Sequence, residues 1–113
     1  MTCIKVKKEN GKVKRILIRG HADYAEHGED IVCASVSSMV ILAINTIVQI
    51  DEKAIKYKQN NSYKIDHEPS TSLIEIQKLN DNETVDTILN TLIKMLEELA
   101  TDYPKNIKIE IGE

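Results

Sequence analysis

The chain has no tryptophan, no phenylalanine and only four tyrosines among its 113 residues. A core without large aromatic rings has to be built from aliphatic side chains, and 42% of the residues are apolar. Two cysteines, Cys3 and Cys33, are too few for a disulfide scaffold and favour reduced thiols inside a cell. The length and composition predict one domain over residues 1–113, large enough to bury a core without help from disulfide bonds or metals.

The chain also lacks an excess of basic residues, since fifteen lysines and arginines oppose eighteen acidic residues, for a net charge of −3. Nonspecific nucleic-acid binding needs many cations that neutralise phosphates, so we expect no direct nucleic-acid partner. The N-terminus has no apolar signal region, and we expect a cytoplasmic protein. The uncharged run 31–50 has about the length of a membrane span, but six polar residues interrupt it. We interpret it as a largely buried helix and expect no membrane partner.

Alternating apolar residues and turn signals predict the order of the remaining elements. An Asn10-Gly11 turn joins the first two strands into a β-hairpin, and an Asn60-Asn61 turn separates two later strands. A second helix begins after Asn82 and stops before Pro104. The predicted fold is α+β with the order ββαβββαβ, in which two helices pack on a mainly antiparallel sheet. The six strands are expected at residues 3–8, 13–19, 54–58, 62–67, 72–78 and 107–111.

The first helix carries the residue of greatest chemical interest. Asp30 is a good N-cap, which makes Cys33 the third residue of a helix that runs to about Gln49. Early helical N–H groups lack partners, so those near Cys33 are candidate oxyanion donors. The positive end of a helix contributes only about 0.3–1 kcal/mol, which is too little to activate a thiol. A nucleophilic Cys33 therefore requires an imidazole that takes its proton.

Two histidines precede Cys33, and His21 is the better candidate base. It is expected where the second strand ends, beside Gly20, whereas His27 is expected within a polar loop. A surface histidine is the alternative reading for both, and His67 has no partner that we can name. For Cys33 the alternative is a buried thiol that acts only as a small hydrophobe.

Other residues near Cys33 are candidates for supporting roles. Asp30, Cys33 and Ser37 are three and four residues apart and share one helix face. Asp30 either orients the imidazole or only caps the helix, and Ser37 either hydrogen-bonds near the thiol or only permits close packing. The loop 20–30 is acidic, which either attracts a basic peptide or only keeps the loop solvated. Its candidate substrate-binding residues are Asp23, Glu26, Gly28 and Glu29.

The segment 20–37 resembles a known motif. Gly20-His21-Ala22, followed by a loop and then by Asp30-Ile31-Val32-Cys33-Ala34 and Ser37, is similar to the pattern of the bacterial ribosomal-processing cysteine protease family, Prp. The chain length and the predicted element order also fit. The resemblance implies that His21 and Cys33 match the catalytic dyad, and that Gly20 and Ala34 belong to the supporting motif. Ser35 departs from the alanine that is more often expected at its position.

The resemblance implies a function as well. It implies a cysteine endopeptidase that removes the N-terminal extension of a large-subunit ribosomal protein, the twenty-seventh in the usual naming, during ribosome assembly. It also implies a homodimer, and we expect neither a metal nor a cofactor. The alternative is a noncatalytic assembly module that binds the same extension and forms a dimer interface with its first helix. A thiol redox role is disfavoured because the chain has no Cys-x-x-Cys pair.

Overall fold

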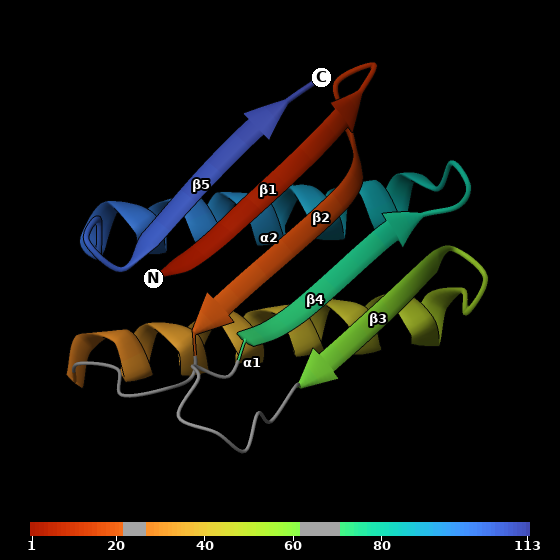
Figure 1. The fold of residues 1–113 in the computed structure, drawn as a ribbon. Helices are drawn as coiled ribbons and strands as arrows, with labels where there is room; N and C mark the ends of the chain where they lie inside the picture. The colour runs from red at the N-terminus through yellow and green to blue at the C-terminus, as the bar shows by residue number, and fades with distance from the viewer. Residues whose placement is uncertain (22–26, 62–70) are drawn as a thin grey trace.

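The structure is a computed structural model that describes residues 1–21, 27–61 and 71–113, with side chains for 1–20, 31–59 and 73–113. Within these residues the elements follow the order ββαββαβ (Figure 1). The strands are β1 (Thr2–Glu9), β2 (Lys12–His21), β3 (Ile55–Asn61), β4 (Thr71–Lys78) and β5 (Ile107–Gly112), and the helices are α1 (His27–Ile50) and α2 (Glu83–Asp102).

The N-terminal hairpin forms as its turn residues predict. Asn10 and Gly11 both have positive φ angles, of 54° and 76°, and join β1 to β2. Two successive positive φ angles give a turn whose twist matches that of the strands it connects, and Asn-Gly adopts them at little cost. The register that follows pairs Ile4 with Ile18 and Val6 with Ile16.

The five strands form one sheet in the order β3-β4-β2-β1-β5. β1 runs parallel to β5, and the other three neighbouring pairs are antiparallel. Both helices lie on the same side of the sheet (Figure 1). We call the side beneath the helices the covered face and the other side the open face. The predicted α+β fold with two helices on a mainly antiparallel sheet is confirmed.

The core lies between the covered face and the helices and is aliphatic. Side chains alternate along a strand, so Ile16 and Ile18 of β2 point to the covered face, where both are buried. Val36 and Ile47 of α1 are buried in the same core as these two isoleucines. Leu89 is one of the buried residues that α2 contributes. The α2 N-cap is Asn82, whose side chain accepts hydrogen bonds from the backbone N–H groups of Thr84 and Val85.

Of two predictions about the strands after α1, one is wrong and the other falls on residues that the structure does not describe. The predicted Asn60-Asn61 turn is wrong, because β3 continues to Asn61, which pairs with Ser72 of β4. The backbone hydrogen bonds of the ladder outweigh the local turn preference of asparagine, which is only a weak prior. The strand expected at 62–67 lies outside the described residues.

Residues Ile31–Ile50 of α1 pass a test for a membrane span that rests on length and composition alone. The core helix of a soluble protein passes the same test. In this structure α1 buries Val32, Val36, Val40 and Ile47 against the covered face.

Candidate active site

Cys33 lies on the side of α1 that faces the sheet, near the start of β1 and the end of β2. Its side chain lines a hollow of about 20 Å³, to which β1, β2, β4 and α1 all contribute. A hollow of this size holds about one water molecule, so it admits a small group and not a whole peptide. The lining residues are Thr2, Ile18, Gly20, Cys33, Val36, Ser37 and Ile74.

Thr2 is a direct polar neighbour of the thiol. Its Oγ1 atom lies 3.5 Å from the Sγ atom of Cys33, and either group can donate the hydrogen bond. Thr2 is only 2% exposed because it shares the covered face with Ile4 and Val6 of the same strand. The sequence analysis did not identify Thr2, although its parity with Ile4 and Val6 is the signal that would have placed it there.

The backbone brings His21 close to this hollow. Gly20 lines the hollow, and His21 is the next and last residue of β2, where it pairs with Thr71 of β4. The prediction that His21 stands at the end of the second strand is confirmed. Its side chain lies outside the described part of the structure.

The predicted N-cap at Asp30 is wrong, because α1 begins at His27 and Cys33 is the seventh residue of the helix. This start places Glu29 and Asp30 in the first turn, where negative side chains interact favourably with the positive helix end. The N–H group of Cys33 belongs to the interior hydrogen-bond ladder of the helix. The predicted oxyanion role of that N–H group is therefore wrong, and the macrodipole acts on Cys33 even less than expected.

The structure places the other candidate residues as follows. Ser37 lines the hollow with Cys33, so the shared helix face of these two is confirmed, whereas Ala34 is exposed and is not among the lining residues. Gly28 and Glu29 were expected in a loop but belong to the first turn of α1. Asp23, Glu26 and His67 lie outside the described residues, as do the side chains of His27, Glu29 and Asp30.

The walls of the hollow determine what chemistry the thiol can perform. Ile18, Val36 and Ile74 surround it, and no charged side chain is among the described lining residues. The nucleophilic form of a cysteine is the thiolate, so a proton acceptor has to lie close by for Cys33 to react. Within the described ranges, no group of three or more His, Cys, Asp and Glu residues could hold a metal. Within the described residues the hollow places a thiol beside hydroxyl groups, and nucleophilic chemistry there requires a base from a neighbouring residue.

Comparison with known proteins also indicates thiol-dependent chemistry, because the sequences that match this chain are cysteine proteases. Residues 1–108 match the sequence model of a family described as cysteine protease Prp. The chain is 28% identical over 104 residues to the ribosomal processing cysteine protease Prp of Staphylococcus aureus, covering 89% of each. It is 27% identical over 92 residues to the protein of the same name from Bacillus subtilis, covering 80% of this chain and 78% of that protein.

Two solved structures share the architecture. The structure of an essential ribosomal processing protease Prp from S. aureus, in complex with a substrate peptide, superposes with a TM-score of 0.75 at 25% identity. That match covers 98% of this chain and 99% of the other. SMU.848 from Streptococcus mutans superposes with a TM-score of 0.83 at 19% identity, covering 100% and 96%, and supports the fold alone.

Proposed function

This chain belongs to the Prp family of cysteine proteases, and from that premise we propose that Cys33 is its nucleophile and His21 its general base. The observation that carries the assignment is the hollow, since Cys33 lines it together with Gly20, the residue that precedes His21. Cys3, the only other cysteine, lines a different hollow with Lys5, Leu17 and Arg19.

The reaction follows the usual course of thiol-dependent peptide hydrolysis. His21 takes the proton of Cys33, and the thiolate attacks the scissile carbonyl carbon to form a tetrahedral oxyanion. The oxyanion collapses, the C–N bond breaks, and the imidazolium of His21 gives its proton to the leaving amine. A water molecule, deprotonated by His21, then attacks the thioester and releases the new carboxyl terminus, and the thiol regains its proton.

Three neighbours take supporting roles in this proposal. Asp30, one turn before Cys33 on α1, orients the imidazole of His21 and stabilises its protonated form. Ser37, one turn after Cys33, and Thr2, on β1, both line the hollow and supply hydroxyl groups to the thiolate. The helical N–H of Cys33 is engaged within α1, so these hydroxyl groups also replace the backbone donors expected from sequence.

The proposed substrate is the precursor of a large-subunit ribosomal protein, the twenty-seventh in the usual naming. The relatives are named for ribosomal processing, and the S. aureus structure was solved with a substrate peptide. We place the reaction in the cytoplasm, where ribosomes assemble. The acidic residues Asp23, Glu26 and Glu29, with Gly28 among them, attract the basic part of the precursor.

We also propose a homodimer that forms through α1. The helix leaves large apolar side chains exposed, and Leu42, at 69% exposure, is the most accessible of them. Exposed apolar side chains that gather on one element mark interaction surfaces. Leu42→Glu is expected to convert the dimer to a monomer in light scattering, whereas Lys94→Glu on α2 leaves the mass unchanged.

The experiment for the proposed activity is incubation of the chain with the full precursor, followed by mass spectrometry of both fragments. Wild-type protein should release one N-terminal peptide and one mature protein whose masses add up to the precursor plus one water. His21→Ala should lower the rate by at least about a hundredfold, as expected for loss of a general base. His67→Ala is the matched control and should process at the wild-type rate.

A wrong substrate and a wrong base would give different results. If wild-type protein leaves the precursor intact but cuts another peptide, the proposed substrate is wrong and the family activity stands. If His21→Ala processes as fast as His67→Ala, the assignment of the base is wrong.

A further inference from the structure

The open face of the sheet is strongly charged. Directly paired residues on neighbouring strands point to the same face, so the register assigns each residue to a side. Lys5 pairs with Leu17, Cys3 with Arg19, and Glu75 with Lys58, while β5 places Lys108 beside Cys3. The charged residues on the open face are Lys5, Lys7, Arg15, Arg19, Lys56, Lys58, Glu75, Lys108 and Glu110.

This face has the opposite charge to the remainder of the chain. It carries seven basic and two acidic residues, an excess of five positive charges. Removing these from the fifteen basic and eighteen acidic residues of the whole chain leaves eight basic and sixteen acidic residues elsewhere. The net charge of −3 is therefore the sum of a basic sheet face and a much more acidic remainder.

Ion pairing accounts for only two of the seven cations. Arg15 lies 2.9 Å from a carboxylate oxygen of Glu75, and Lys108 lies 3.3 Å from Glu110. Lys56 and Lys58 act on Glu75 only at longer range, after Arg15, and all three lower the pKa of its carboxyl group. Among the described side chains no ion pair engages the other five cations, which are Lys5, Lys7, Arg19, Lys56 and Lys58.

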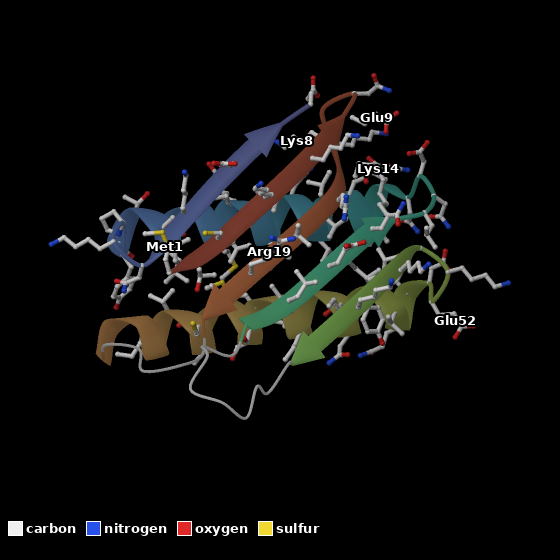
Figure 2. All side chains as sticks on the ribbon, viewed as in Figure 1. Met1, Lys8, Glu9, Lys14, Arg19 and Glu52 are labelled. Carbon is white, nitrogen blue, oxygen red and sulfur yellow. The ribbon has the colours of Figure 1, made fainter. Side chains whose placement is uncertain are left out.

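The shape of the face suits a row of phosphate groups. Lys5 and Arg19 flank a hollow of about 70 Å³ whose remaining lining is Cys3 and Leu17. Arg19 lies over β2 on the side of the sheet that faces away from the helices (Figure 2). Neighbouring strands are about 4.8 Å apart, so cations from β1, β2 and β3 are distributed over about 15 Å across the sheet.

We propose that the open face binds the phosphodiester backbone of double-stranded RNA. Lysines and arginines spaced over one face of a sheet match a regular array of phosphates. None of the described residues on this face is aromatic, so the described part of the face offers no platform on which single-stranded bases can stack. A second copy of the chain would bring two positive faces together, which disfavours self-association here. The choice of RNA over DNA rests on the proposed function, since a ribosomal precursor is processed among ribosomal RNA.

The net charge alone predicted no nucleic-acid partner, because a net value averages over surfaces that face in different directions. The strand order gathers the cations on one side. Lys56 and Lys58 are more than forty residues from Lys5 and Lys7 in sequence, and only the pairing through β4 and β2 brings them onto one face.

The test is fluorescence anisotropy of a labelled RNA duplex of about 20 base pairs, titrated with the full chain at several KCl concentrations. Five phosphate contacts predict a plot of log affinity against log salt with a slope of about −4 to −5. The variant Lys5→Gln/Lys7→Gln/Arg19→Gln should bind at least tenfold more weakly at 50 mM KCl. It should also reduce the slope by about 3, because each lost phosphate contact removes about 0.9.

The matched control is Lys53→Gln/Lys94→Gln/Lys105→Gln, which removes the same charge from exposed sites outside the open face. The control should bind the duplex like the wild type. A second variant, Lys56→Gln/Lys58→Gln, removes the two cations of β3, at one edge of the sheet, and should bind the duplex more weakly than the wild type. Thermal melting should show that all three variants are folded, since every substituted side chain is exposed.

The proposal is overturned if the open-face and control variants bind equally, or if a polyglutamate peptide or an anionic lipid vesicle binds more tightly than the duplex. It is also overturned if wild-type affinity is weaker than about 10⁻⁴ M at 50 mM KCl, below ordinary nonspecific binding. Cys33→Ala should bind the duplex normally, so a failure of RNA binding is distinct from a failure of proteolysis.

Discussion

The two cysteines of this chain lie on opposite faces of one sheet. Cys3 belongs to β1 and lines a hollow of the open face with Lys5, Leu17 and Arg19. Cys33 belongs to α1 and approaches the covered face, where it contacts Thr2, the residue immediately before Cys3. Both are partly buried thiols, yet one has cationic neighbours and the other has aliphatic walls and hydroxyl groups.

The comparison shows that the alternating side chains of β1 contribute to two faces of the sheet with different environments. Alternation along β1 sends Thr2, Ile4 and Val6 into the core and Cys3, Lys5 and Lys7 to the open face. The covered face provides stability and, in our proposal, the nucleophile, while the open face provides charge for recognition. Substitutions at matched positions on the two faces should therefore have very different effects.

The largest contrast in stability should come from two ion pairs. On the covered side Lys78 lies 2.8 Å from Asp86, and both side chains are almost fully buried. Asp86→Ala leaves the buried ammonium with only the exposed Asp81, 3.7 Å away, and should lower the free energy of unfolding by about 3–5 kcal/mol. Glu75→Ala breaks the exposed pair with Arg15 and should cause no measurable loss in urea denaturation. Equal losses would contradict the contrast.

A second contrast uses two neighbours in β2. Ile16 is fully buried on the covered face, and Leu17 is half-buried on the open face. Ile16→Ala creates a cavity and should cost about 2–5 kcal/mol in the free energy of unfolding. Leu17→Ala removes less buried area and should cost less than about 1.5 kcal/mol. A larger loss at Leu17 would mean that another surface covers the open face in solution.

Thr2 offers a smaller and more specific test at the thiol. Thr2→Val keeps the shape of the side chain and removes the hydroxyl group that lies 3.5 Å from Cys33 Sγ. If this hydroxyl stabilises the thiolate by about 0.5–1.5 kcal/mol, processing should slow two- to about tenfold. Thr2→Ser, which retains the hydroxyl, should restore most of the rate. An unchanged rate in Thr2→Val would show that the contact is only structural.

The smallest expected effect is the acid titration of Glu75 on the open face. The hydrogen bond from Arg15 holds the pKa of the Glu75 carboxyl below its ordinary value of 4.5, with help from Lys58 and Lys56. A carboxylate with a lowered pKa in the folded state stabilises the fold above pH 4.5, and this contribution disappears as the pH falls through the folded-state value. NMR titration should give a midpoint below 4.5, and Arg15→Gln should move it upward. A midpoint at or above 4.5 in the wild type would contradict the paired geometry.

The sequence predicts those features that depend on local patterns. The hairpin follows from Asn10-Gly11, the bounds of α2 from Asn82 and Pro104, and the place of His21 at the end of β2 from the alternation that precedes it. The start of α1 was misplaced because Asp30 is suitable both as an N-cap and within the first turn.

Features that depend on strand pairing were not predictable in this way. The contact between Thr2 and Cys33 joins residues 31 positions apart, and the basic open face needs β3, β2 and β1 in their observed order. Sequence periodicity assigns a residue to a face of its own strand, but it does not reveal which strands lie side by side.

The central claim is that the thiol of the covered face, and not that of the open face, performs the proteolysis. Its most direct measurement is the processing rate of the ribosomal-protein precursor by Cys33→Ala and Cys3→Ala, assayed by mass spectrometry under identical conditions. Our account predicts that Cys33→Ala forms no product while Cys3→Ala processes near the wild-type rate, with both variants folded. Processing by Cys33→Ala at the wild-type rate, or its loss in Cys3→Ala alone, would contradict the account.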